Sequence, residues 1–327
     1  MIEGRHEISS VSAEGISFSP GTPINVLIAT RNGERTIGHV IDNLFSQPLP
    51  ENTVLNLTIC ANGCTDQTVD VVREAYVRVP EAREDIQTQL IESDTPGHPH
   101  ALNTMIRELD EPEIVIALND DVFPSMGSLQ ALYLAMVENP ELGAIGIQGR
   151  PIPTYRHKKA SFAEKVGVAM INGQPDGAIG GNMCAFRPKA IGEFPDILSE
   201  DVFLTFKSLS ETGGYGIVNI EGENVYYFLP KSLTDLVRDT VIHKTAERQF
   251  ERRYPEHSDD YGALKQASKR RGIRNRFSHR LVENSEYSRS TRLTAVAVYR
   301  LADLITGFNE IMYPQVSAQY NRVNKSA

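Results

Sequence analysis

A strand followed by a polar loop and a helix occurs repeatedly between residues 24 and 121, and this pattern constrains the fold more than any other feature. Strands are predicted where short apolar, β-branched segments occur, at Ile24–Ala29, Leu55–Cys60, Gln87–Ile91 and Ile114–Leu118. Helices are predicted where apolar residues recur at helical spacing, first over residues 37–45 and later over residues 129–137. Strands that alternate with helices predict an α/β fold, with a mostly parallel, Rossmann-like central sheet flanked by helices.

Polar segments follow the predicted strands. The second strand runs into Asn62-Gly63-Cys64-Thr65-Asp66, and the fourth ends at Asn119-Asp120-Asp121. In a mostly parallel sheet, ligands bind beyond the carboxyl ends of the strands. The sequence therefore predicts a binding site that these two polar segments share.

Asp120 and Asp121 close an otherwise apolar strand, where two carboxylates are costly unless a positive charge compensates them. Carboxylate oxygens suit Mg²⁺ or Mn²⁺, and a cation held by one or two carboxylates typically completes its shell with substrate phosphates. The alternative is a solvated loop that caps the following helix. On these two residues alone, both interpretations stay open.

Glu200 and Asp201 precede an apolar helical pattern at residues 202–206. One interpretation is a helix start, because acidic side chains there cap the backbone and suit the helix dipole. The other is a general base that removes the proton of an acceptor hydroxyl. Gly180-Gly181-Asn182 permits either a tight turn or close approach of a ligand. The two histidines of Gly97-His98-Pro99-His100 either bind a metal or are solvated.

Composition excludes several classes of protein. A chain of 327 residues with 40% hydrophobic residues can bury a sizeable core. No apolar stretch is long enough to span a membrane, and no signal peptide is recognisable. Three cysteines do not make a disulfide framework, which fits a reducing compartment. We therefore expect a cytoplasmic protein.

The net charge of −9 is distributed unevenly. From residue 261 onward the chain has 12 Lys and Arg against 4 Asp and Glu, which leaves residues 1–260 with a net charge of −17. Such a body should repel nucleic acid. Between Lys265 and Arg280, seven basic residues occur without an acid. This run is either a solvated arm or a contact with an anionic acceptor or with anionic lipid at the inner membrane surface.

The chain is expected to have three parts. Residues 1–22 lack periodicity and are interpreted as a tail, in which Ile2-Glu3-Gly4-Arg5 resembles a protease site left from an expression vector. Residues 23–255 would form the α/β domain, and residues 256–327 a basic, helical extension. Within the extension, Leu293–Ile311 is apolar but carries Arg300 and Asp303, which favours a packing or dimerising helix and leaves a homo-oligomer open.

Taken in order, these segments resemble the motifs of the inverting glycosyltransferase family 2, which has the GT-A fold, over about Ile24–Lys244. Val26–Glu34 resembles the family's first strand and nucleotide loop, and Asn62–Thr68 resembles its D-G-S-T-D-x-T motif. Gly97–Asn103 resembles G-K-x-x-A-L-N, and Asn119–Asp121 resembles the D-x-D metal motif. Gly180–Arg187 resembles the glycine segment, and Glu200-Asp201 resembles the E-D pair. His98 stands at the lysine of the third motif.

The resemblance implies a role for each matching residue. Asp121 would coordinate a divalent cation, Mn or Mg, and Asp120 would approach the ribose of a nucleotide-sugar donor. Asp201 would be the catalytic base, with Glu200 beside it in the motif. The other residues expected in the nucleotide-sugar site are Ala29, Thr30, Arg31, Glu34, Asn62, Asp66, Asn103, Gly181 and Asn182.

Two departures from the family pattern concern the donor. The first Asp of D-x-D is Asn119 in this chain. The residue before Asn62, which is often an Asp that contacts the nucleobase, is Ala61. The nucleobase is therefore open, although uridine is the commonest in the family.

A third departure concerns the family's Q-x-x-R-W motif. It matches literally at Gln249–Arg253, whereas counting from Pro230 places its equivalent near Asp239–His243. We prefer the second register. It offers His243 as a metal or diphosphate ligand and Lys244 as a phosphate partner.

The expected function is metal-dependent transfer of a sugar from a nucleotide diphosphate sugar, a UDP-sugar first, to an acceptor hydroxyl by direct displacement with inversion. Two alternatives remain. A sugar nucleotidyltransferase shares a related α/β core, but its first loop is glycine-rich with Arg and Lys, unlike residues 29–33 here. A catalytically silent sugar- or lipid-binding module is suggested by Asn119 and Ala61, and opposed by Asp121 and Asp201.

Overall fold

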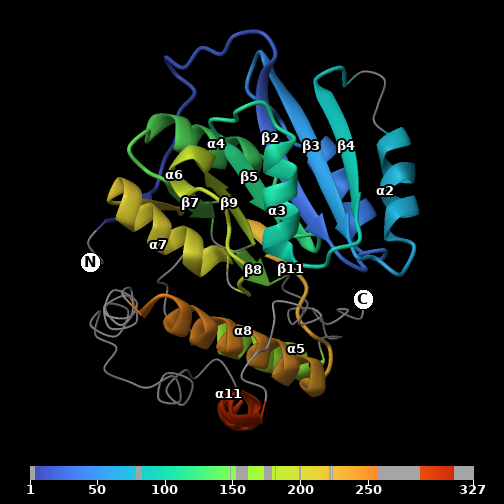
Figure 1. The fold of residues 1–327 in the computed structure, drawn as a ribbon, viewed down its shortest axis with the longest axis vertical. Helices are drawn as coiled ribbons and strands as arrows, with labels where there is room; N and C mark the ends of the chain where they lie inside the picture. Colours follow the sequence, from blue (N-terminus) through green and yellow to red (C-terminus); the bar gives the residue numbers. More distant parts are fainter. Residues whose placement is uncertain are drawn as a thin grey trace.

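The centre of the protein is an eight-stranded sheet, shown in Figure 1. The computed structural model describes residues 4–78, 83–147, 149–151, 161–172, 179–180, 182–198, 200–220, 222, 224–255 and 288–312. In their order across the sheet, the strands are β1 (Arg5–Ile8), β10 (Tyr215–Val218), β7 (Ala144–Ile147), β9 (Met183–Phe186), β5 (Val115–Leu118), β2 (Thr22–Thr30), β3 (Thr53–Asn62) and β4 (Ile86–Ser93). Only β9 runs antiparallel to its neighbours in this sheet. The mostly parallel α/β sheet expected from the sequence is confirmed.

Helices cover both faces of the sheet. α1 (Ile37–Phe45), α2 (Thr68–Val77) and α4 (Ser128–Glu138) share one hydrophobic cluster with Val26 and Ile28 of β2. α3 (His98–Arg107), α6 (Pro188–Ile191) and α7 (Glu200–Thr212) share another with Leu27. Successive strand side chains point to opposite faces, so a strand that is apolar throughout supports both layers.

A small second sheet lies beyond the carboxyl ends of the central strands. Its strands, in the order β6-β11-β8, are β6 (Val122–Pro124), β11 (Val225–Tyr227) and β8 (Gly149–Pro151). β6 follows β5 after three residues, and β8 follows β7 after one. The small sheet thus continues two central strands, and it places β11 next to the acidic segment Asn119–Asp121.

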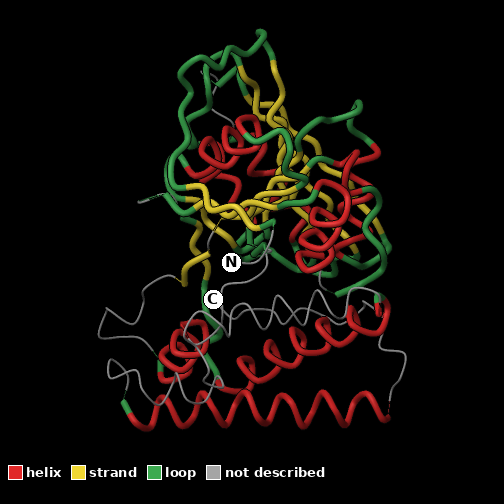
Figure 2. The backbone as a smooth tube through the Cα atoms, turned by 90° about the vertical axis from the view of Figure 1, so that its left-hand side faces the viewer, coloured by secondary structure: helices red, strands yellow, loops and turns green. Residues whose placement is uncertain are grey.

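Three further helices form a layer below the two sheets, as Figures 1 and 2 show. They are α5 (Phe162–Asn172), α8 (Leu233–Arg253) and α11 (Arg289–Met312). Val166 of α5, Leu236 of α8 and Val298 of α11 belong to one small hydrophobic cluster. Ser232 caps α8, because its hydroxyl accepts a hydrogen bond from the Asp235 amide at 3.1 Å. This cluster joins residues from both sides of the domain boundary predicted at residues 255 and 256.

The structure corrects one sequence-based boundary. Residues 1–22 were expected to form a tail, yet Arg5–Ile8 is strand β1 and pairs in parallel with β10. The prediction missed this strand because its residues alternate little and only Ile8 is buried. β1 lies at the edge of the sheet, where pairing requires less apolar surface than in a central strand.

Several predictions fall on residues outside the described ranges. The basic run Lys265–Arg280 lies there, as do Gly181 and Ser199. Of the extension, residues 288–312 are described, and the helix expected at Leu293–Ile311 is α11. Within the described part of the chain, none of the helices combines the length and apolarity needed to cross a bilayer.

Candidate active site

The loops after β2 and β3 are fastened to each other by side chains. The Asn32 carboxamide oxygen accepts a hydrogen bond from the Thr65 amide at 2.8 Å. Two more hydrogen bonds join the loops in opposite directions. The Glu34 backbone amide donates to the Asp66 carboxylate at 3.3 Å, and the Gln67 backbone amide donates to the Glu34 carboxylate at 3.0 Å. In this structure the carboxylates of Glu34 and Asp66 hold the two loops together, and their predicted contact with a nucleotide stays a prediction.

The side chain of Asp120 is held by a hydrogen bond from the last residue of β2. The Thr30 hydroxyl donates a hydrogen bond to Asp120 Oδ2 at 2.7 Å, although 90 residues separate them in the sequence. Gly33 lies against this pair, and a Cβ atom at Gly33 would stand 2.5 Å from Thr30 Oγ1 and 2.8 Å from Asp120 Oδ2. The glycine therefore allows the loop backbone to approach the carboxylate, as a binding loop around a ligand requires.

Replacement of Gly33 by alanine is expected to displace Asp120 and to weaken binding of the donor about tenfold, or ~1.4 kcal/mol. The added methyl group occupies the space of the Thr30–Asp120 hydrogen bond, so the carboxylate has to turn away. Isothermal titration with a nucleotide sugar measures the change.

Gly38→Ala is the matched control for this substitution. Gly38 lies in α1, and its added methyl group would meet Val71 of α2 at 3.1 Å, away from Asp120. Alanine also favours a helix, so this variant should bind the donor as the wild type does. Equal affinities of the Gly33→Ala variant and the wild type would contradict the predicted role of the Thr30–Asp120 pair.

Asn62 and Asn103 bind backbone groups. The side-chain amide of Asn62 donates a hydrogen bond to the Gly97 carbonyl at 3.0 Å, and this bond joins the end of β3 to the start of α3. The Asn103 amide donates to the Phe194 carbonyl at 2.7 Å and accepts from the Phe194 amide at 2.9 Å. Both polar groups of Asn103 are thus engaged in joining α3 to the segment before α7, and a contact with the nucleotide stays a prediction for this residue.

The acidic segment and the Glu-Asp pair lie at the same edge of the sheet. The Asn119 amide donates to the Asn182 carbonyl at 3.1 Å, beside the pairing of β5 with β9. Burial raises the pKa of the Cys184 thiol in β9, and the charges of Asp201 and Glu200 raise this pKa further. Such a charge effect requires proximity, so both carboxylates lie near β9. The structure thereby joins Asn119 to Asn182 and places Glu200 and Asp201 near β9.

His98 contacts Glu200 across the same edge. The His98 Nδ1 atom lies 3.1 Å from Glu200 Oε1, and both side chains are largely buried. Nδ1 has no hydrogen bond of good geometry, and the contact is an ion pair when the imidazole is protonated. These two residues are 102 positions apart, and no sequence motif predicts that they are neighbours.

A second set of polar side chains surrounds Tyr227 of β11. Tyr227 pairs with Val122, the residue that follows Asp121. Burial raises the pKa of the Tyr227 phenol, and the charges of Asp239 and Asp121 raise it further. His243, one turn after Asp239 on α8, has its Nε2 atom 3.9 Å from the Asp239 carboxylate. The structure therefore brings Asp239 and Asp121 to one phenol, with His243 beside Asp239.

These donors are of the kind that Mn²⁺ or Mg²⁺ binds, namely carboxylate oxygens with an imidazole. Within the described ranges, no three His, Cys, Asp or Glu side chains gather into a group that could hold a metal ion alone. A cation held by one or two protein groups and by substrate phosphates requires no such cluster. The residues around Asp121 fit a cation of that type.

Arg31 and Ala29 occupy the loop and strand end next to Thr30. The Nε atom of Arg31 is buried and has no hydrogen-bond partner among the described residues. A buried donor without a partner costs about 1–3 kcal/mol, and a bound anion or base can satisfy it. Ala29 is buried in β2 and offers only its backbone. The orphan donor of Arg31 fits a ligand on this loop.

Sequence reasoning missed Tyr227 and gave Asp239 no role of its own. Tyr227 belongs to no motif, and its place depends on hydrogen bonds that hold the start of β11 beside the end of β6, such as the one that the Ser125 amide donates to the Asn224 carbonyl at 2.8 Å. The preferred register of α8 was the one available signal for Asp239. Asp239 and Asp121 both raise the pKa of the Tyr227 phenol, and the register of the motif in α8 stays a prediction.

The literal match to Q-x-x-R-W serves in packing. Gln249 accepts a hydrogen bond from the Leu198 amide at 2.9 Å, and Phe250 stacks on Phe206 of α7 with ring centroids 5.0 Å apart. Lys244 also has a packing role, because its ammonium group lies 3.5 Å from the ring centroid of Tyr299 in α11. The contact predicted between Lys244 and a phosphate stays a prediction.

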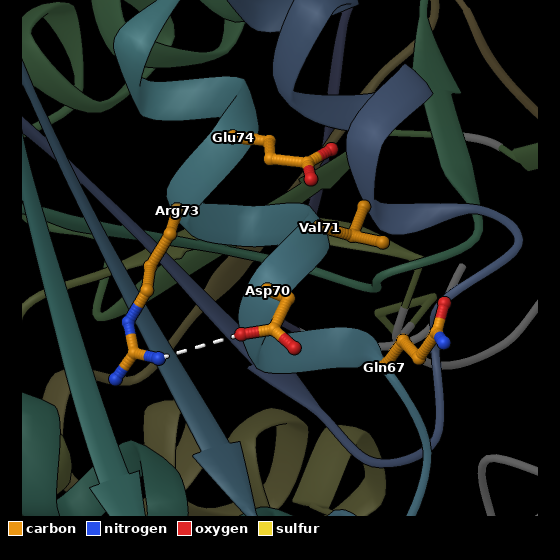
Figure 3. A pocket seen from close by; sticks show the side chains of 5 residues that line it. All are labelled: Gln67, Asp70, Val71, Arg73 and Glu74. Atoms are coloured by element: carbon orange, nitrogen blue, oxygen red, sulfur yellow. Dashed lines mark hydrogen bonds and ion pairs between the residues drawn. The ribbon is translucent and has the colours of Figure 1, made fainter.

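A hollow of about 400 Å³ lies on the exposed side of α2, and Figure 3 shows the side chains that line it. It is lined by Gln67, Asp70, Val71, Arg73 and Glu74, and Arg73 lies 3.5 Å from Asp70. All of these residues lie at the start of one surface helix or in it, and none belongs to the predicted site. The candidate active site is the carboxyl edge of the central sheet, not this hollow.

The family described as glycosyl transferase family 2 matches residues 25–189, a range that includes β2 through β9. Among curated proteins, none matches the chain.

Two solved structures are similar in fold. One is the mannosyltransferase PcManGT from Pyrobaculum calidifontis in complex with GDP-Man and Mn²⁺, at 18% identity and a TM-score of 0.56, covering 94% of this chain and 84% of that one. The other is glucosyl-3-phosphoglycerate synthase from Mycobacterium tuberculosis in complex with phosphoglyceric acid, at 14% identity and a TM-score of 0.51, covering 77% of this chain and 88% of that one. These similarities establish the GT-A fold expected from the sequence.

Proposed function

Because this chain belongs to glycosyltransferase family 2, we propose that it is a metal-dependent, inverting glycosyltransferase that moves a hexosyl group from a nucleotide diphosphate sugar to an acceptor hydroxyl. The observation that carries the proposal is that two pairs of acidic residues lie at one edge of the sheet. Asp120 and Asp121 stand at the end of β5, and Glu200 and Asp201 lie beside β9, the neighbouring strand.

In the proposed reaction Asp201 removes the proton of the acceptor hydroxyl. The oxygen then attacks the anomeric carbon from the face opposite the diphosphate, so that the configuration is inverted. Oδ1 of Asp201 accepts a hydrogen bond from the Val202 amide at 2.8 Å, which fixes the orientation of the carboxylate. General-base catalysis of this kind contributes roughly 10² to 10⁴ in rate.

Other residues would bind and orient the donor. The Asp120 carboxylate, held by Thr30, would accept a hydrogen bond from a ribose hydroxyl, and the Arg31 guanidinium would bind the nucleotide. Asp121, with His243, would hold the divalent cation. When bound, such a cation stabilises negative charge on the leaving diphosphate, a contribution of several kcal/mol.

A nucleotide sugar with Mn²⁺ is expected to raise the melting temperature of the protein more than the nucleotide sugar or Mn²⁺ alone. A ligand at 100 times its dissociation constant stabilises by about 2.7 kcal/mol. The panel should contain UDP-glucose, UDP-N-acetylglucosamine and GDP-mannose, the last because the similar mannosyltransferase was solved with it. We expect the UDP-sugars to give the larger shift.

Release of nucleotide diphosphate from the best donor distinguishes an enzyme from a silent module. A binding module would show the thermal shift and release no nucleotide. If none of the nucleotide sugars shifts the melting temperature in the presence of Mn²⁺, the proposed donor class is wrong.

A further inference from the structure

His98 is the first residue of α3 and stands between the loop after β3 and the start of α7. Its imidazole Nδ1 lies 3.1 Å from Glu200 Oε1. The side chains of His98 and Glu200 are 17% and 11% exposed, so water screens their interaction little. Neither the resemblance nor the sequence pattern assigns a partner to this histidine.

On one side, His98 is tied to the donor end of the site. The Asn62 amide donates to the carbonyl of Gly97, the residue immediately before His98, at 3.0 Å. Gly97 has a φ of 139°, in a region that L side chains rarely adopt, so the chain turns into α3 at this residue. One peptide unit therefore separates the imidazole from the contact that holds the end of β3.

On the other side, His98 is tied to the base. Glu200 is the first residue of α7, and Asp201 follows it directly. Both carboxylates act on the Cys184 thiol, which is itself buried in β9. A carboxylate at such a site is costly unless it is paired with a cation. An imidazolium at His98 would offset this cost for Glu200.

We propose that His98 is a positioning residue for the transfer reaction. Its imidazolium pairs with Glu200, and the pair fastens the first turn of α7 to the donor loop, so that the Asp201 carboxylate is held at a fixed place relative to the bound donor. This inference rests on the proposed function. His98 acts through Glu200 and Asp201 and is not itself in contact with the reacting atoms.

Two other contacts join the same segments and isolate the role of the His98–Glu200 pair. Asn103 binds the Phe194 backbone, and Arg107 forms an ion pair with Glu193. The Arg107 and Glu193 side chains are 60% and 66% exposed, and such a pair contributes little. Arg107→Gln therefore removes a cation between α3 and the segment before α7 without touching the site, and it is the matched control.

The test measures kcat and KM for release of nucleotide diphosphate by the full chain with Mn²⁺ and the donor that gives the largest thermal shift. His98→Gln and Glu200→Gln should each lower kcat at least tenfold, with KM for the donor within about twofold. The double variant should be no slower than the slower single variant, because one interaction is lost in all three. His98→Lys keeps a cation opposite Glu200 and should retain kcat within about threefold. Arg107→Gln should match the wild type.

The pH profile gives a readout that a purely structural histidine would not change. The charged groups near the imidazole are Glu200 and Asp201 on α7, while the Cys184 thiol stays neutral because its pKa is raised. Histidine loses its proton near neutral pH, whereas lysine keeps its own to about pH 10. The pH dependence of kcat should therefore differ between the wild type and His98→Lys, which place different cations opposite Glu200.

Three results would overturn the inference while leaving the proposed function standing. They are a wild-type kcat in His98→Gln, a loss confined to KM for the donor, and coincident pH profiles of the wild type and His98→Lys. Absence of nucleotide release by the wild type would instead refute the proposed function. The melting temperatures of all variants identify any that fail to fold, and in that case His98→Lys carries the comparison.

Discussion

Replacing Asp201 by asparagine is expected to lower kcat by about 10² to 10⁴ and to leave donor binding intact. Asparagine has nearly the same shape as aspartate and can still accept the hydrogen bond that Oδ1 receives from the Val202 amide. It cannot take up the proton of the acceptor hydroxyl. The variant therefore separates proton removal from the integrity of α7. Nucleotide release and donor affinity, measured on the same preparation, distinguish the two effects.

Glu211→Gln is the matched control for this experiment. Glu211 lies in the last turn of α7 and pairs with Lys207 one turn before it, so its replacement removes a carboxylate from the same helix at a solvent-accessible position. The control should retain wild-type kcat. If Asp201→Asn also turned over at a near wild-type rate, Asp201 would not be the base.

Asp121→Ala is expected to remove the effect of Mn²⁺ on donor binding, with at least a tenfold loss of affinity when Mn²⁺ is present. The remaining groups are the Asp239 carboxylate, which raises the pKa of Tyr227, and the His243 imidazole, which lies 3.9 Å from that carboxylate; both are on α8. Without Asp121 these groups lie apart from the acidic segment, so a cation would lose its link to the donor site. Titration of the nucleotide diphosphate with and without Mn²⁺ measures the loss.

Asp42→Ala provides the comparison for Asp121. Asp42 lies in α1 and pairs with Arg78 at 3.1 Å, where both side chains are 48% exposed. Its replacement removes one negative charge and leaves the sheet edge unchanged. The assignment of Asp121 fails if the alanine variant keeps both the wild-type affinity and its dependence on Mn²⁺.

Strands β2, β3, β4 and β5 of the central sheet could be predicted from short, apolar, β-branched segments, whereas β7, β9 and β10 were not predicted. β2, β3 and β5 carry apolar residues toward both faces, a pattern that few other structures produce. β1 could not be predicted in this way, since an edge strand with one buried residue leaves almost no pattern. Its position follows from the backbone pairing with β10, which depends on the folded sheet.

The candidate site was predictable where it depends on strand ends, and not where it depends on side-chain partners. Thr30 and Asp120 meet because β2 and β5 are neighbours that end at the same edge. The pairing of His98 with Glu200 depends on how α3 and α7 cross the sheet. The role of Asn103 depends on the irregular segment around Phe194, which has no sequence signature. Such contacts depend on packing between elements that are distant in the sequence, and they leave no local pattern from which they could be predicted.

α8 has a further consequence, because it reaches both halves of the site. Asp239 near its start faces Tyr227 together with Asp121, and Gln249 ten residues later holds the Leu198 amide just before α7. A helix advances 1.5 Å and turns about 100° for each residue. The ten residues between these two contacts therefore fix their separation along the helix at about 15 Å. Substitutions along α8 can be absorbed, but an insertion or deletion between Asp239 and Gln249 would turn one end out of alignment with the other. The length of this helix, more than its composition, sets the spacing between the cation side and the base side.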